Sequence, residues 1–209
     1  MKRILREKFF NRPTLIVAKE LLGKYLVRKV NGREICGMIT EIEAYDGFHD
    51  KASHASRGKT ERNKIMFGPA GHWYIYFTYG MHWILNIITR EEGYPAAVLI
   101  RGVLLKEGPA PLEAGRPEAA VAVPLAGRPL TGPARVTKYF KIDNKLNGEK
   151  ANKASPFGKL RAGGLWIEDR GIKIPRSKIK RSPRIGVHYA GPVWAGKLHR
   201  FYIKQKDAY

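Results

Sequence analysis

The sequence predicts a single α+β domain in which a mainly antiparallel sheet is flanked by a few helices. The chain has 209 residues, of which 44% are hydrophobic, so residues 1–209 can build one sizeable core and demand no second domain. Short runs of β-branched and aromatic residues recur along it, and two pairs of runs are joined by the turns Asn31-Gly32 and Tyr79-Gly80. Helical character is expected mainly over residues 13–22 and 133–141.

The N-terminal segment predicts a helix followed by a hairpin. Asn11 is a candidate cap for a helix over residues 13–22, and Gly23 suits the left-handed end of that helix. A strand over residues 25–30 leads into Asn31-Gly32, which is the signal of a type I′ turn. The return strand is expected over residues 33–44.

This return strand ends in two carboxylates, Glu41 and Glu43. If no bulge intervenes, strand alternation places them on the same face as Ile35 and Ile39. An apolar face that ends in carboxylates is a suitable setting for an acid or base with a shifted pKa. For Glu41 alone the simpler interpretation is an ion pair with Arg101, which lies in a strand predicted over residues 96–105.

A long polar loop separates that strand from an aromatic hairpin. Residues 48–71 predict a loop with one short helix, and loops of this length are uncommon unless they are functional. Strands over residues 72–78 and 81–89 flank Tyr79-Gly80. Asn86 lies within the apolar run WILNII, so it must be either hydrogen-bonded or functional. Three further aromatic residues of this hairpin are expected in the core: Trp73, Phe77 and Trp83.

The rest of the chain alternates irregular and basic segments. Residues 107–132 are rich in Pro, Gly and Ala and predict irregular surface chain. A helix over residues 133–141 carries Arg135 and Lys138, and a polar, basic loop over residues 147–164 follows it. Short strands are expected at residues 165–168, 183–189 and 198–204.

The charge of the chain is strongly positive. It contains 39 Lys and Arg against 18 Asp and Glu, a net charge of +21. The part from Pro133 onward carries 19 basic and 5 acidic residues, so the excess is concentrated there. Such a basic half indicates a polyanionic partner, of which nucleic acid is the commonest, although a lysine-rich solubilised surface would have the same composition.

Composition also bears on cofactors and location. Cys36 is the only cysteine, so an internal disulfide and a Cys-based zinc site are excluded, and a reducing compartment is expected. The first ten residues contain no signal-peptide pattern, and no apolar run approaches the ~20 residues of a membrane span. We therefore expect an intracellular protein, in the cytoplasm or nucleoid of a prokaryote or in a nucleus. We expect it to act as a monomer, with no cofactor, metal or membrane contact.

The stretch from Glu41 to Asn86 contains the chemistry. It begins with carboxylates, continues through a loop with His49 and His54, and ends in a run of aromatic residues around Tyr79. A carboxylate next to aromatic side chains in a basic protein indicates work on a nucleobase that has been taken out of its stack.

Many of these residues occur in an order that resembles the 3-methyladenine (alkyladenine) DNA glycosylase family, and the resemblance covers nearly the whole chain. It is carried by FFNRPTLIVAKELLGKYLVR from Phe9, Glu43-Ala44-Tyr45 with Gly47, Asp50, Ala52, His54, Gly58, Thr60, Arg62-Asn63, Met66-Phe67, Pro69, Tyr74, Tyr76, Tyr79-Gly80-Met81, Asn86, Arg101, Thr131-Gly132-Pro133, and RIGVHYAG…LHRFYI from Arg184. A single element such as EAY would be a weak signal, but this many in order is specific.

The resemblance implies a base-excision repair enzyme that binds double-stranded DNA and flips a damaged purine into a pocket. Its fold would be one domain on a curved, mainly antiparallel, partly barrel-like sheet. Its site residues would be Glu43 as general base; Arg101 and the carbonyl of Ile185 holding the water; Tyr45, His54, Tyr76 and Asn86 around the base; Tyr79 with Met81 intercalated in the duplex; and Arg135 with Lys138 on phosphates. The preferred lesion, whether 3-methyladenine, 7-methylguanine, hypoxanthine or ethenoadenine, stays open.

Two alternatives remain at this stage. A non-catalytic nucleic-acid-binding module would keep the sheet but not need Glu43 and Arg101, and an enzyme acting on free nucleosides would not need the positive charge or an exposed Tyr79. A bifunctional lyase would need an amine nucleophile near the sugar, and none of the residues assigned to the water or to the base is a lysine, so monofunctional hydrolysis is favoured. The chain departs from the family pattern in residues 107–132, at Arg135, where lysine is common, and at His188-Tyr189.

Overall fold

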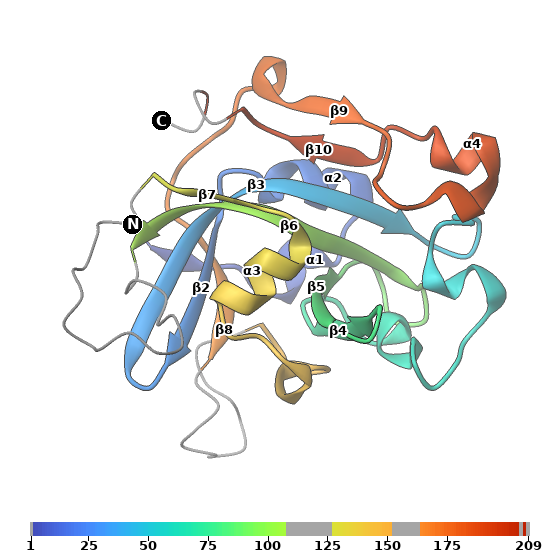
Figure 1. Cartoon of the computed structure of the whole chain (residues 1–209), viewed down its shortest axis with the longest axis horizontal. Coiled ribbons are helices and arrows are strands. Elements are labelled where there is room, and N and C mark those ends of the chain that lie inside the picture. Colours follow the sequence, from blue (N-terminus) through green and yellow to red (C-terminus); the bar gives the residue numbers. More distant parts are fainter. Residues whose placement is uncertain (1, 108–126, 152–163, 205–206, 208–209) are drawn as a thin grey trace.

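Two long strands, β3 (Arg33–Asp46) and β6 (Ala96–Glu107), pair antiparallel and form the spine of the sheet in the computed structural model (Figure 1). The structure describes residues 2–107, 127–151, 164–204 and 207. On its other edge β3 pairs first with β2 (Tyr25–Val30) and then with β10 (Arg200–Tyr202). The main strand order is β1-β8-β2-β3-β6-β5-β4, the sheet does not close, and the predicted α+β class is confirmed.

The smaller elements attach to this spine. The remaining strands are β1 (Arg3–Ile4), β4 (Trp73–Thr78), β5 (His82–Ile88), β7 (Pro129–Thr131), β8 (Leu165–Asp169) and β9 (Lys180–Ser182). The α-helices are α1 (Glu7–Phe10), α2 (Thr14–Leu21), α3 (Pro133–Tyr139) and α4 (Gly191–Ala195). The 3₁₀ helices are η1 (His54–Arg57), η2 (Lys64–Phe67), η3 (Asn144–Leu146), η4 (Arg176–Lys178) and η5 (His188–Ala190).

Both predicted hairpin turns are confirmed. Asn31 and Gly32 have positive φ angles of 49° and 78°, as a type I′ turn requires. Tyr79 and Gly80 have φ angles of 51° and 64°, and the Met81 N–H donates to the carbonyl of Thr78 at 3.1 Å. A tyrosine rarely adopts this left-handed conformation, so the side chain at the tip of the β4–β5 hairpin is held there at some cost.

The predicted helices are present, but the expected cap is wrong. Asn11 does not cap α2; its N–H donates to the carbonyl of Glu7 and closes the short helix α1 instead. Pro13 precedes α2 without a side-chain cap. Figure 1 shows α3 in front of β5 and β6, whereas α2 lies behind β3.

One predicted strand is wrong and others are shifted. Residues 183–189 do not form a strand, because Gly186 adopts a positive φ of 76° and the chain then turns into η5. The strand of this region is β9, which pairs with β10. The loop 48–71 holds two 3₁₀ helices, η1 and η2, rather than one helix. The segment 107–132 contains the short strand β7, which its composition does not predict. Residues 108–126 of that segment lie outside the described residues, as do residues 152–163 of the loop predicted at 147–164.

A bulge breaks the alternation expected along β3. The pairing with β6 shifts register between Ile39 and Glu41 and again between Glu41 and Ile42. The single face predicted for Ile35, Ile39 and the two carboxylates therefore does not run uninterrupted. Glu41 and Glu43 nevertheless both reach Arg101.

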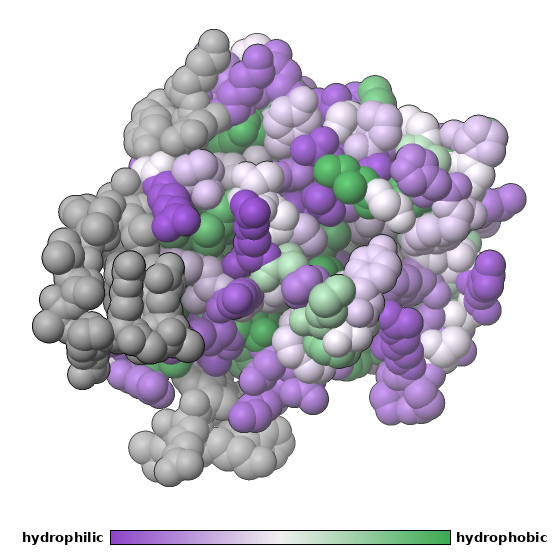
Figure 2. Space-filling view, viewed as in Figure 1, coloured by the Kyte–Doolittle hydropathy of each residue, from purple (hydrophilic) through white to green (hydrophobic). Residues whose placement is uncertain are grey.

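The core lies between the sheet and its helices. Its largest buried side chains include Trp73, Trp166 and Phe140, and the Trp73 indole N–H donates to the carbonyl of Leu165 at 3.1 Å. Trp83 packs against this core at its edge, but Phe77 is 42% exposed and lies against Trp83, so its expected place in the core is wrong. On the face viewed in Figure 2, hydrophilic residues dominate and hydrophobic ones form separate small patches. Within the described residues, no helix has the length and apolar character needed to cross a membrane.

Candidate active site

Glu43 lies on β3, a strand that has neighbours on both of its edges. Within β3 it is paired with Leu99 of β6 on one side and with Arg200 of β10 on the other. None of its side chain is exposed to solvent. A carboxylate on a central strand between two neighbours has little freedom to move, so its position is set by the fold.

Three groups contact the Glu43 carboxylate. The backbone N–H of Ile185 donates to Oε1 at 2.8 Å, and the hydroxyl of Tyr45 donates to Oε2 at 2.9 Å. The Arg101 Nε lies 3.4 Å from Oε1. The structure thus brings together four residues that the sequence predicted for the chemistry, although Ile185 contributes its N–H here where the prediction concerned its carbonyl.

Burial and hydrogen bonding act on Glu43 in opposite directions. Loss of water raises the pKa of Glu43 above its ordinary value, while Arg101, the Ile185 N–H and the Tyr45 hydroxyl lower it. Burial is the larger effect. Glu43 is therefore a stronger base than a surface glutamate.

Glu41 is the second carboxylate of this cluster. Its Oε1 accepts from Arg101 Nε at 3.1 Å and from Arg200 Nε at 2.7 Å. The ion pair that the sequence predicted between Glu41 and Arg101 is confirmed. Arg101 consequently lies between two carboxylates.

Aromatic side chains form a wall next to Glu43. The rings of Tyr74 and Tyr76 are 5.4 Å apart, and His54 meets Tyr76 edge-on with ring centroids 4.6 Å apart. His54 is accessible from solvent, but its Nδ1 lies 3.0 Å from the Tyr74 hydroxyl. Partial burial and the nearby Arg62 lower the pKa of His54, so its ring is neutral at pH 7. Burial raises the pKa of Tyr74 to about 12, which keeps its hydroxyl protonated.

Asn86 is the buried polar residue of β5. Its Nδ2 donates to the carbonyl of Tyr74, the residue opposite it on β4, at 3.1 Å. The sequence predicted that a polar residue in this apolar strand would be either hydrogen-bonded or functional, and Asn86 is hydrogen-bonded. Its predicted contact with the edge of a base stays a prediction.

The hairpin tip presents exposed apolar groups. Tyr79 is 82% exposed and Met81 is 66% exposed. Together with Phe77, which is 42% exposed, they form an exposed apolar patch at this end of the hairpin.

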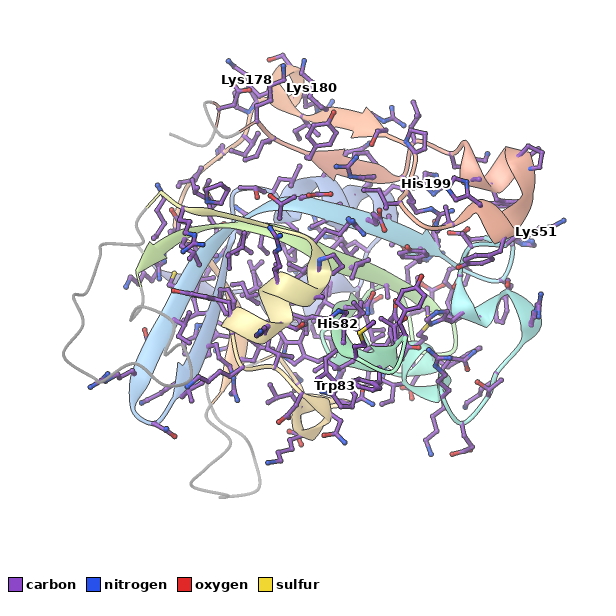
Figure 3. The ribbon with its side chains drawn as sticks, viewed as in Figure 1. Lys51, His82, Trp83, Lys178, Lys180 and His199 are labelled. Carbon is purple, nitrogen blue, oxygen red and sulfur yellow. The ribbon has the colours of Figure 1, made fainter. Side chains whose placement is uncertain are left out.

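The basic residues of α3 stand beside this hairpin. Arg135 and Lys138 are both exposed and one helical turn apart. The hydroxyl of Thr137 donates to the carbonyl of Trp83 at 2.8 Å and so fastens α3 to β5. Figure 3 shows His82 and Trp83 next to this helix. The two basic side chains therefore extend the surface that the hairpin begins.

The sequence did not single out the buried ion pair between Asp50 and Arg184. Both side chains are completely buried, and Arg184 Nη2 donates to Asp50 Oδ1 at 2.8 Å. Arg184 Nη1 also donates to the carbonyl of Ala44 at 2.9 Å. The pair holds the segment before Ile185 against the end of β3. Both residues belong to the motifs that carry the family resemblance. They lie 134 residues apart in the chain, so no local sequence pattern could predict that they pair.

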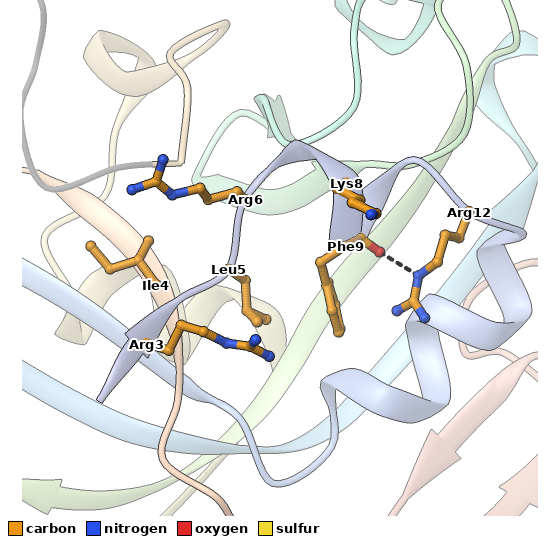
Figure 4. Close-up of a pocket in the computed structure, with 7 residues that line it drawn as sticks. All are labelled: Arg3, Ile4, Leu5, Arg6, Lys8, Phe9 and Arg12. Atoms are coloured by element: carbon orange, nitrogen blue, oxygen red, sulfur yellow. Dashed lines mark hydrogen bonds between the residues drawn. The ribbon is translucent and has the colours of Figure 1, made fainter. Parts of the chain in front are cut away.

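Two other features bear on function. A hollow of about 450 Å³ lies against the N-terminal segment, and its lining residues share nothing with the Glu43 cluster (Figure 4). The residues that line this hollow are Arg3, Ile4, Leu5, Arg6, Lys8, Phe9 and Arg12. Four of them are cations and none is a carboxylate, so the hollow has no carboxylate base.

In the described parts of the chain, no three His, Cys, Asp or Glu side chains are grouped so that they could hold a metal ion.

Comparison with known proteins identifies the family. The profile of the family described as methylpurine-DNA glycosylase matches residues 8–207. The chain belongs to this family. It is therefore a DNA glycosylase, a hydrolase of DNA repair that acts on alkylpurines. The match confirms the family resemblance that the motifs suggested.

Relatives from distant organisms agree over almost their full length. A protein of Legionella pneumophila strain Paris is 40% identical over 98% of this chain and 96% of its own. One from Methanocella arvoryzae is 42% identical over 96% and 92%, and one from Carboxydothermus hydrogenoformans is 40% identical over 96% and 95%. Each carries the name "Putative 3-methyladenine DNA glycosylase".

Proposed function

We propose that this glycosylase excises alkylated or deaminated purines from double-stranded DNA with a water activated by Glu43, and leaves an abasic site. The observation that supports this best is the Glu43 carboxylate, which is fully buried but lies between a cation and the Tyr45 hydroxyl. The relatives named for 3-methyladenine support an alkylated purine as substrate.

In the proposed reaction, the bond between the sugar C1′ and the purine nitrogen breaks and its electron pair leaves with the base. Positive charge develops on the sugar, and the ionised Glu43 stabilises it. Glu43 takes one proton from the attacking water, whose oxygen forms the new bond to C1′. Arg101, together with the backbone at Ile185, orients that water.

The aromatic wall would hold the extruded base. Tyr45 and Tyr76 offer ring faces, which attract a positively charged alkylated purine through cation–π contacts. His54 and Asn86 would contact its edges, with Asn86 disfavouring the exocyclic amine of guanine. Because His54 is neutral, it does not repel a cationic base.

Duplex binding would use the exposed hairpin and helix. Tyr79 and Met81 would enter the gap left by the extruded nucleotide, while Arg135 and Lys138 bind phosphates. We propose that the protein acts as a monomer on intracellular DNA, and without a cofactor or metal.

The test is release of free base from an alkylated duplex under single-turnover conditions. Glu43→Gln should bind this duplex with near wild-type affinity but lose ~10²–10⁴-fold in rate. Glu168→Gln is a matched control, because Glu168 is also buried and paired with an arginine, Arg170, but lies on β8. A wild-type protein that binds but releases no base would favour the non-catalytic alternative, and borohydride trapping on DNA would indicate a lyase.

A further inference from the structure

The Arg101 guanidinium is shared between two carboxylates. Its Nε lies 3.1 Å from Glu41 Oε1 and 3.4 Å from Glu43 Oε1. The same Glu41 oxygen accepts from Arg200 Nε at 2.7 Å. Glu41 therefore has the shorter contact with Arg101 and a second cation of its own.

Packing holds Glu41 in this position. Only 8% of its side chain is exposed, compared with 11% for Arg101 and 22% for Arg200. Gly102, its partner across the sheet, has no side chain, and a Cβ there would lie 3.0 Å from the Glu41 Cβ. Arg200 is fixed in turn by Ser182, whose hydroxyl accepts from Nη1 at 3.1 Å. The two carboxylates thus compete for one cation in a rigid frame.

We propose that Glu41 is a positioning residue for catalysis, which holds Arg101 so that only part of its charge is available to Glu43. The inference rests on the proposed function, in which Glu43 is the general base. A full ion pair with Arg101 would stabilise the ionised Glu43 and make it a poorer proton acceptor. Glu41, which has the shorter contact with Arg101, competes for that charge and leaves Arg101 close enough to orient a water.

Besides Arg101, other charged and titratable groups also surround Glu43. They are Tyr45 on β3, Tyr76 on β4, Arg200 on β10, Arg184 with Asp50, and Tyr189 in η5. Arg184 is paired with Asp50 and is the smallest of the effects that lower the pKa of Glu43, Arg200 is paired with Glu41, and burial raises the pKa values of the three tyrosines. The strength of the interaction between Arg101 and Glu43 is therefore the feature of the site that Glu41 can change.

The experiment is the pH dependence of single-turnover excision on a duplex alkylated at its purines. Glu41→Gln should free Arg101 for Glu43, lower the pKa of Glu43, and move the acid limb of the profile to lower pH by on the order of one pH unit. Its plateau rate should fall, because the base is weaker. Arg200→Gln should do the opposite: Glu41 then draws Arg101 more strongly, and the acid limb moves to higher pH.

If Glu41 positions Arg101, the acid limbs of Glu41→Gln and Arg200→Gln should shift in opposite directions. A general loss of structure would lower the excision rates of both variants without separating their acid limbs. Glu168→Gln should leave the profile unchanged, and thermal melting should show that each variant is folded. Equal or absent shifts in Glu41→Gln and Arg200→Gln would overturn the inference. If Glu43→Gln kept wild-type activity, the proposed function itself would fail, and this result is independent of the two shifts.

Discussion

Tyr79 offers a way to separate the stability of the protein from its activity. Its φ of 51° is in the left-handed region, and its side chain is 82% exposed. Glycine adopts this conformation without strain, whereas alanine keeps the strain and loses the ring. We therefore expect Tyr79→Gly and Tyr79→Ala to affect excision alike but to affect unfolding differently.

The two magnitudes follow from the geometry. Relief of the left-handed conformation should make Tyr79→Gly more stable than Tyr79→Ala by about 1 kcal/mol. Loss of the ring should remove ~1–3 kcal/mol of stacking in the duplex, which corresponds to ~5- to 140-fold in the population of extruded base. Extrusion itself costs a few kcal/mol. The ring would thus offset much of that cost.

The assay compares one lesion opposite a matched and a mismatched base, with extrusion followed by a fluorescent base analogue. Both variants should slow excision most in the stable pair and least in the mismatch, and non-specific binding should barely change. Urea unfolding of both variants measures the stability difference. Equal slowing in every context, or none, would assign Tyr79 to ordinary packing instead. A Tyr79→Gly variant less stable than Tyr79→Ala would refute the argument from strain.

Three further predictions concern charge. Burial raises the pKa of Glu43, so Glu43 contributes to the stability of the fold at pH values below the ordinary pKa of glutamate, and this contribution is lost as the pH rises through the raised pKa. Glu43→Gln should therefore have a melting temperature no lower than that of the wild type at pH 8. A markedly lower melting temperature would contradict this. Asp50→Asn leaves its buried arginine partner without a counter-charge, so urea unfolding should show a loss of about 3–5 kcal/mol, and a loss below about 1 kcal/mol would mean that the pair is not stabilising. Neutralising both Arg135 and Lys138 should reduce the slope of log binding constant against log salt by ~0.9 for each phosphate that is no longer neutralised, measured on undamaged duplex, whereas Lys19→Gln on α2 should leave the slope unchanged.

Local chemistry explains what the sequence could predict of the fold. Asn31-Gly32 and Tyr79-Gly80 specify their turns within two residues, and the neighbouring strands follow from the turns. Glu43 could be placed near the far end of a strand for the same reason. The family motifs then made it possible to predict that Glu43 is the base, although no single spacing would have done so.

Long-range contacts could not be predicted in this way. The N–H of Ile185 reaches Glu43 across 142 residues, and nothing local to either residue indicates it. The run Ile185, Val187, Tyr189 alternates like a strand, but the positive φ of Gly186 breaks it, and Ile185 instead serves the carboxylate. The bulge at Glu41 has no local signal either, since it arises from the pairing of β3 with β6.

The depth of Glu43 has a consequence for selectivity. A carboxylate with no exposed surface, fixed between β6 and β10, cannot travel to a base inside a duplex, so in the proposed reaction the nucleotide would have to come to it. Undamaged DNA that slides across the outer surface would then be protected by distance alone. Under the proposed mechanism the enzyme would sample each nucleotide for the time it spends outside the helix, and a lesion that weakens its own pairing would stay outside longer. Discrimination would begin as a matter of residence time, before any group in the pocket has touched the base.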